Sequence, residues 1–259
     1  MRINKYISHN SKYSRREADE LIKSGFVKIN KQIASLNNTV KKNDKVSIKG
    51  KLINEKKIFT VIVYNKAKGE LVSKKDDRGR KTIYDSLPRH FSSFLPVGRL
   101  DYASEGLLLL SDSVKVVSAL MNSDLERKYY LKIRGIVNEK VIEAMQNGLE
   151  IVNSKKGAHA KTKISSMKIS PFLEYEILGS SGGYTKLKVL INEGKNRELR
   201  RFFAFFDLEV VDLKRVSFGV VDLGMLASGK YRFLSKSEYE KLRDFLEYKR
   251  QKPQKTIKI

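Results

Sequence analysis

The chain of 259 residues contains no cysteine. This absence excludes disulfides, thiolate metal sites and every mechanism that needs a cysteine nucleophile. Histidine is scarce, and His9, His90 and His159 stand far apart without the spacing of metal ligands, so we expect no structural or catalytic metal. No apolar run is long enough to cross a bilayer, and MRINKYISHN lacks the apolar stretch of a signal peptide. We therefore expect a cytoplasmic protein with no membrane partner.

Acidic residues are also few, because 29 Asp and Glu stand against 53 Lys and Arg, which gives a formal net charge of +24. A balance this basic is typical of a protein that binds nucleic acid, and an acidic membrane surface is the weaker alternative. The length favours a small domain joined to a larger one.

The first 57 residues are the most basic part, with 15 Lys and Arg against 5 Asp and Glu. SRREADELIKSG predicts a helix, because Ser14 and Glu17 form a capping box, Gly25 can close the C-terminus and apolar residues lie on one stripe. Short strands are expected at FVKIN and KVSIKG. Most basic side chains lie off the apolar stripe, and we expect a phosphate-binding face made of Arg2, Lys5, Lys12, Arg15, Arg16 and Lys23.

The segments RINKYIS, SRREADELIKSGFVKINK and DKVSIKGK resemble the αL motif, a small RNA-binding module found on many RNA-modifying enzymes. The resemblance implies binding to structured RNA and leaves the chemistry open. We predict an RNA-binding domain over 1–54, with a polar linker around KGKLINEKK.

The rest of the chain predicts an α+β domain over 55–248, followed by a basic, disordered tail over 249–259. Apolar alternation favours antiparallel strands at RKYYLKIRG, HAKTKISSMKI, FLEYEIL and YTKLKVLIN, after a first strand in IFTVIVYN. Helices are expected at SVKVVSALMN, NEKVIEAMQNG, NRELRRFFAFFD and SKSEYEKLRDFLEY, the last with a capping box at Ser235 and Glu238.

PVGRLDYASEGLLLLSDS places Asp101 in a loop beside a leucine run that anchors it in the core. Arg99 could keep this carboxylate ionised by ion pairing, and a fixed carboxylate can act as a nucleophile or general base. The alternative is an aspartate that caps a turn, which is common in loops.

In EGKNRELRRFFAFFD a helical projection places Arg200 at the border of the buried face, and Arg197 and Arg201 away from it. We therefore expect Arg200 to reach a carboxylate at the edge of the core, and Arg197 and Arg201 to meet phosphate in solvent. In ERKYYLKIRG the period of two places Tyr129 on the apolar face of a strand.

Together, GRLDYASEGLLLLSD, RKYYLKIRG, EGKNRELRRFF and VDLKRVSFG resemble the successive motifs of the RsuA/RluB family of ribosomal RNA pseudouridine synthases. The resemblance implies a small αL domain and a catalytic domain built on a mostly antiparallel mixed sheet with flanking helices. It makes Asp101 the catalytic aspartate, Tyr129 the active-site tyrosine, Arg200 the partner of Asp101, and Leu213 a wall of the uracil pocket. The substrate-binding set adds Arg99, Lys195, Arg197 and Arg201.

The resemblance further implies a flipped-out uridine in ribosomal RNA, either naked or in a pre-ribosomal particle, as the substrate. The isomerisation needs no cofactor, and we expect a monomer. Asp101 would act at C1′ or abstract a ribose proton, and the sequence leaves both routes open. Large-subunit RNA is favoured, with small-subunit RNA as the alternative. Two departures from the family pattern are Lys68, where proline is usual, and Ser104, where threonine is commoner.

Three other functions would also suit a basic chain. A methyltransferase acting on uridine C5 would require a cysteine and a glycine-rich cofactor loop, and the chain has neither. The sequence also allows a non-catalytic ribosome-assembly factor with the same fold. A non-specific polybasic DNA binder also stays open, since salt-dependent binding alone would not distinguish it.

Overall fold

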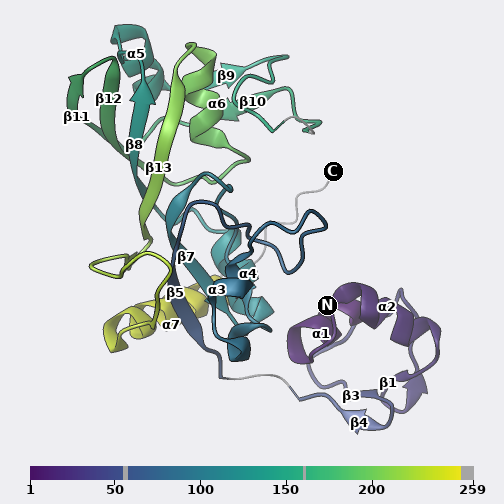
Figure 1. Ribbon diagram of the computed structural model, residues 1–259. Coiled ribbons are helices and arrows are strands. Elements are labelled where there is room, and N and C mark those ends of the chain that lie inside the picture. The colour runs from purple at the N-terminus through teal and green to yellow at the C-terminus, as the bar shows by residue number, and fades with distance from the viewer. Residues whose placement is uncertain (55–57, 160–161, 252–259) are drawn as a thin grey trace.

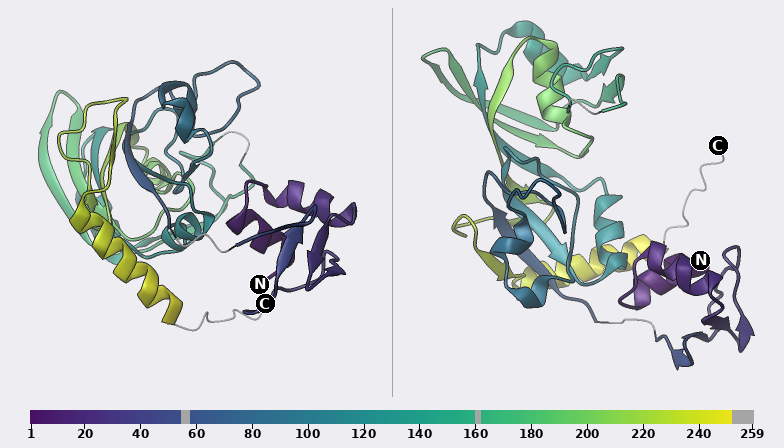
Figure 2. Two further views of the ribbon diagram at one scale, coloured as in Figure 1. Left: turned by 90° about the horizontal axis from the view of Figure 1, so that it is seen from below. Right: turned by 45° about the vertical axis from the view of Figure 1, so that its right-hand side comes forward.

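The computed structural model describes residues 1–54, 58–159 and 162–251. They form a small N-terminal module and a larger unit built around one long sheet (Figure 1). Helix α1 of the module contacts helix α4 of the larger unit. The module lies beside α4 in both further views (Figure 2).

The N-terminal module consists of two helices over a four-stranded sheet with the order β2-β1-β3-β4. Its elements are α1 (Ile3–Asn10), α2 (Arg15–Lys23), β1 (Val27–Ile29), β2 (Gln32–Ile33), β3 (Val46–Ile48) and β4 (Lys51–Leu52). The predicted capping box is confirmed: Glu17 N donates to Ser14 Oγ, and Ser14 N donates to Glu17 Oε2. Gly25 has the expected positive φ after the helix.

A small core of the module includes Ile3, Ile7 and Ile22, all buried. Of the six basic residues predicted to form an RNA-binding face, Lys5 is half-buried and Arg2, Lys12, Arg15, Arg16 and Lys23 are exposed. Their charge is therefore available at the surface of the module, as expected.

The larger unit contains a nine-stranded sheet in which seven strands follow the order β11-β12-β8-β13-β7-β5-β15, while β14 pairs with β13 and β6 with β7. The strands are β5 (Val61–Lys66), β6 (Leu95–Pro96), β7 (Glu105–Ser111), β8 (Arg127–Arg134), β11 (Glu174–Ser181), β12 (Tyr184–Ile191), β13 (Glu209–Phe218), β14 (Val221–Asp222) and β15 (Tyr231–Phe233). Only β13 and β7 pair in parallel among the described strands. The expected mostly antiparallel mixed sheet is confirmed.

Helices cover this sheet in two groups (Figure 1). The helices are α3 (Ile83–Ser86), η1 (Arg89–Phe91), α4 (Val114–Met121), α5 (Glu139–Asn147), α6 (Glu198–Phe205) and α7 (Lys236–Gln251). Apolar residues of α5 and α6 pack against β8, β12 and β13. Apolar residues of α4 and α7 pack against β5 and β7. The sheet is thus continuous, but separate apolar cores support its two halves.

The predicted bounds of three segments are wrong. The expected linker around KGKLINEKK begins too early, because Lys51–Leu52 form β4 and Ile53 packs against the module core. The strand predicted from 159 to 169 is reduced to β10 (Met167–Ile169), which pairs with β9 (Leu149–Ile151), and 162–166 form no strand. Helix α7 continues past 248, while 252–259 of the predicted tail lie outside the described residues. The domain limits at 54 and 248 stay predictions.

None of the helices in the described ranges has the length and apolar character needed to cross a membrane.

Candidate active site

Asp101 lies in the loop of residues 97–104 between β6 and β7. The leucine run that follows belongs to β7 and is buried on both faces of the sheet. Leu107 and Leu109 join one apolar cluster, and Leu108 and Leu110 join another. Because β7 is anchored on both sides, the Asp101 loop extends from a rigid strand.

Lys66, at the end of β5, anchors the backbone of this loop through its side chain. Its side chain is fully buried, and Nζ donates to the carbonyl oxygens of Ala67 at 2.9 Å, Asp101 at 3.1 Å and Ser104 at 2.7 Å. Burial lowers the pKa of Lys66 to about 8. Three carbonyl acceptors on one ammonium fix the backbone on both sides of the Asp101 side chain.

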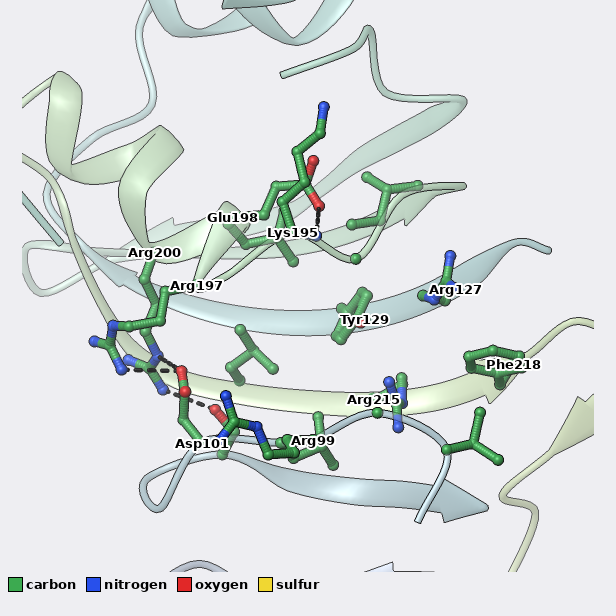
Figure 3. Close-up of a pocket in the computed structure, with 18 of the residues that line it drawn as sticks. Arg99, Asp101, Arg127, Tyr129, Lys195, Arg197, Glu198, Arg200, Arg215 and Phe218 are labelled. Atoms are coloured by element: carbon green, nitrogen blue, oxygen red, sulfur yellow. Dashed lines mark hydrogen bonds and ion pairs between the residues drawn. The ribbon is translucent and has the colours of Figure 1, made fainter. Parts of the chain in front are cut away.

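Two arginines meet the Asp101 carboxylate. Arg197 Nη1 donates to Oδ2 at 2.9 Å, and Arg200 Nε lies 3.5 Å from the same oxygen (Figure 3). The predicted pairing of Arg200 with a carboxylate is confirmed, but the prediction that Arg197 points into solvent is wrong. Helix α6 begins only at Glu198, and Arg197 precedes it with φ of 51°, so a helical projection does not describe its direction. The expected Arg99–Asp101 ion pair is not formed, since Arg197 and Arg200 occupy that role.

Arg200 is held from several directions. Its Nη1 donates to the Val210 carbonyl at 2.6 Å and its Nη2 to Ser104 Oγ at 3.1 Å. Burial and the neighbouring Arg197 lower the pKa of Arg200, while Asp101 acts in the opposite direction. Arg200 therefore ties helix α6, strand β13 and the Asp101 loop together. Ser104, where threonine is commoner in the resembled family, supplies the hydroxyl acceptor.

The expectation that Arg201 faces solvent and meets phosphate is wrong. Its side chain is fully buried, with Nη1 donating to the Ile164 carbonyl at 3.1 Å and Nη2 to the Ser154 carbonyl at 3.0 Å. Ser154 and Ile164 both lie between β9 and β10, and no apolar periodicity in the sequence indicates that they contact Arg201. Arg201 does not line the pocket beside Asp101.

A pocket of about 160 Å³ opens beside Asp101. All of the predicted catalytic and substrate-binding residues except Arg201 line it, namely Arg99, Asp101, Tyr129, Lys195, Arg197, Arg200 and Leu213. Tyr129 and Leu213 are buried on β8 and β13, and the alternating burial of β8 confirms the predicted apolar face of Tyr129. Arg99 and Lys195 are exposed. The pocket thus combines a paired carboxylate, an aromatic wall and exposed cations.

Several residues that line the pocket were not predicted from the sequence, and those with charged or aromatic side chains are Arg127, Glu198, Arg215 and Phe218. The period of two that places Tyr129 on the buried face of β8 also places Arg127 there, and this signal was available. Glu198 accepts a hydrogen bond from Lys195 N at 2.9 Å, and burial raises its pKa to about 7.

Lys68, the residue in place of the usual proline, forms an exposed ion pair with Asp212 of β13. The next residue, Gly69, has a positive φ of 78° and donates its N–H to the Tyr102 carbonyl at 2.9 Å. The loop of residues 66–69 is therefore joined to the Asp101 loop without a proline.

Within the described ranges, no three His, Cys, Asp or Glu side chains are grouped as metal ligands.

Comparison with known proteins identifies both parts of the chain. Residues 60–205 match the family model for RNA pseudouridylate synthase, and residues 1–46 match that of the S4 domain. The chain belongs to the RNA pseudouridylate synthase family and carries an N-terminal S4 domain, so it is an isomerase acting on RNA. The predicted family resemblance and class of enzyme are confirmed.

Named relatives and a solved structure agree with this assignment. A Helicobacter pylori (strain ATCC 700392 / 26695) protein named an uncharacterized RNA pseudouridine synthase is 54% identical over 95% of each chain. Ribosomal large subunit pseudouridine synthase B of Bacillus subtilis (strain 168) is 31% identical, over 93% of this chain and 95% of its own. A crystal structure of a pseudouridylate synthase superposes with a TM-score of 0.62 at 27% identity, covering 93% of this chain and 99% of that chain.

Proposed function

We propose that this enzyme converts one uridine of large-subunit ribosomal RNA to pseudouridine, with Asp101 as the catalytic carboxylate. The observation that carries the assignment is the Asp101 carboxylate itself. It is half-buried at the edge of the pocket, and Arg197 and Arg200 hold one of its oxygens. The choice of large-subunit RNA rests on the likeness to proteins named ribosomal large subunit pseudouridine synthase B, including the Bacillus subtilis protein at 31% identity.

The reaction breaks the N1–C1′ bond, turns the base and joins C5 to C1′, after which the C5 proton leaves. A carboxylate beside the ribose can stabilise positive charge at C1′, attack C1′, or remove a ribose proton. Arg197 and Arg200 hold the Asp101 carboxylate in a fixed orientation for each of these routes.

The remaining parts of the site position the nucleotide. A base inside an RNA helix is inaccessible, so the target uridine must leave the stack before it reaches Asp101. Tyr129 and Leu213 provide a buried wall on which the base can rest, and the exposed Arg99 and Lys195 provide charge for the flanking phosphates. The basic residues exposed on the S4 domain would hold RNA at a distance from the pocket.

The substitution Asp101→Asn tests this proposal. We expect the variant to form no pseudouridine on fragments of ribosomal RNA, and to bind them nearly as tightly as the wild-type enzyme. Carbodiimide labelling read by primer extension measures the product, and the same method applied to ribosomal RNA from cells with and without the gene locates the target. Product at the wild-type rate from the variant would refute the assignment of Asp101. A difference only in small-subunit RNA would refute the choice of substrate.

A further inference from the structure

The pocket contains two buried arginines that play no part in holding Asp101. Arg127 of β8 is 5% exposed and Arg215 of β13 is 4% exposed. In Figure 3 the labelled side chains run from Asp101 past Tyr129 to Arg127 and Phe218, with Arg215 beside Tyr129 on the neighbouring strand. This agrees with the strand register, in which Arg215 lies opposite Tyr129 and Phe218 opposite Arg127.

Each arginine is anchored through part of its guanidinium. Arg127 Nη1 donates to the carbonyls of Leu125 at 2.9 Å and Asn192 at 2.7 Å. Arg215 Nε donates to the Leu107 carbonyl at 2.8 Å, while its Nη2 is buried and has no hydrogen-bond partner among the described residues. Gly106 allows this close approach of β7 to β13, because a Cβ there would lie 2.2 Å from the Arg215 carbonyl oxygen.

Neither Arg127 nor Arg215 forms an ion pair with an acidic residue in the described part of the chain. Burial and Arg215 act to lower the pKa of Arg127, while Glu198 and Asp124 act to raise it without forming an ion pair. Phe218 offers partial compensation, since its ring centroid lies 4.6 Å from Arg127 Cζ and 5.5 Å from Arg215 Cζ. Burying two like charges with an unused donor is costly unless a ligand supplies an acceptor.

The position of Arg127 and Arg215 indicates which part of an RNA substrate they would bind. At the Asp101 end of the pocket, Asp101 and Arg197 are half-buried and Arg99 is exposed, whereas Arg127, Arg215 and Phe218 at the other end are all buried. A flipped nucleotide keeps its ribose and phosphates with the RNA strand and inserts its base. The buried arginines therefore fit the far edge of the base better than a backbone phosphate.

We propose that Arg215, supported by Arg127, binds the carbonyl oxygens of the target uracil and stabilises the negative charge that develops on them. This inference rests on the proposed function. When the N1–C1′ bond breaks, its electron pair passes to N1 and is delocalised onto the two carbonyl oxygens. This holds whether Asp101 attacks C1′ or removes a ribose proton, and the arginines keep their own protons. A fixed donor aimed at developing charge contributes to the rate rather than to binding alone.

The test compares uridine with 5-fluorouridine at the target position of the RNA fragment that the wild-type enzyme modifies. Fluorine withdraws electrons and stabilises the departing base by itself, so it reduces the need for the arginine. We expect Arg215→Met to lower the single-turnover rate constant about 100-fold with uridine, the loss typical of one such donor. With 5-fluorouridine we expect a loss of about 10-fold or less. Consumption of the starting nucleoside, measured by mass spectrometry after digestion, applies to both substrates.

Controls separate this role from folding and from phosphate binding. Arg134→Met changes an exposed arginine on the other face of the same strand as Arg127, and we expect it to leave both rates unchanged. Arg215→Lys keeps the positive charge but lacks the planar array of guanidinium N–H donors, and we expect an intermediate rate and a wild-type melting temperature. A third substrate carries uncharged methylphosphonates on both sides of the target, which removes the phosphate charges that a backbone-binding arginine would contact.

Two outcomes would overturn the inference. One is an equal loss with uridine and 5-fluorouridine at saturating enzyme. The other is a loss seen only in Kd that disappears with the methylphosphonate substrate, which would assign the arginines to the backbone. Failure of the proposed function looks different, because the wild-type enzyme would then modify no large-subunit fragment, or Asp101→Asn would retain activity.

Discussion

Arg197 and Asp101 stand 96 positions apart in the sequence, and Arg197 Nη1 donates a 2.9 Å hydrogen bond to Asp101 Oδ2. A second bond, from Arg197 Nε to the Gly157 carbonyl at 2.8 Å, fixes the guanidinium from the other side. Arg200 approaches the same carboxylate oxygen at 3.5 Å while bonding to Val210 and Ser104. The two arginines therefore have different tasks: Arg197 makes the shorter contact with the carboxylate, and Arg200 joins the elements around it.

Arg197→Gln tests this division. A hydrogen bond to a charged group contributes about 1.5–3 kcal/mol, which corresponds to a rate loss of about 10- to 150-fold. We expect the variant to lose activity in this range and to melt near the wild-type temperature, because Arg197 lies at the pocket edge. Arg200→Gln should lower both the rate and the melting temperature, since Arg200 is buried. Single-turnover assays and thermal unfolding measure the two effects, and a wild-type rate for Arg197→Gln would contradict the prediction.

Lys66→Met should destabilise the enzyme by about 3 kcal/mol, because three carbonyl oxygens lose a buried charged donor. Urea unfolding monitored by circular dichroism measures the free energy. Lys68→Met is the matched control, since Lys68 is an exposed residue in the same loop and its ion pair with Asp212 should contribute no more than about 1 kcal/mol. Equal stability of the two variants would contradict the anchoring role of Lys66.

Arg201→Met and Arg16→Gln should affect RNA binding in different ways. Arg16 is exposed on the S4 domain, so we expect its loss to reduce the slope of log K against log salt by about 1. Arg201 is buried against backbone carbonyls, so we expect its loss to lower stability without changing that slope. Filter binding over a series of salt concentrations gives the slopes. A reduced slope for Arg201→Met would show that Arg201 meets phosphate after all.

His9 should make stability depend on pH. Burial, with Lys5 and Lys115 nearby, lowers the pKa of His9 from 6.5 to about 4. As the pH falls from 6.5 towards 4, the unfolded chain takes up a proton that the folded chain does not, so stability decreases over this window and is unaffected by His9 above it. Thermal unfolding of the wild-type enzyme and His9→Gln at pH 7.5 and 4.5 checks this. The variant should lose less stability on acidification, and equal losses would contradict the assignment.

Sequence patterns predicted the parts of the fold that depend on neighbouring residues. The capping boxes at Ser14 and Ser235 involve residues three positions apart, and both are formed. The period of two in RKYYLKIRG predicted the buried face of β8 because alternation is a local property of a strand. The same reasoning failed for Arg197, whose backbone is left-handed, and for Arg201, which is covered by a distant segment.

The sequence by itself determined the chemical inventory: a carboxylate beside a leucine strand, an arginine-rich helix start, a basic N-terminal module and no thiol. Only the tertiary structure decided how these groups meet. The pairing of Arg197 with Asp101 depends on one backbone angle at the start of α6. The grouping of Arg127, Arg215 and Phe218 depends on the pairing of β8 with β13. Residues so far apart are brought together by the packing of the whole sheet, and no short stretch of sequence encodes that packing.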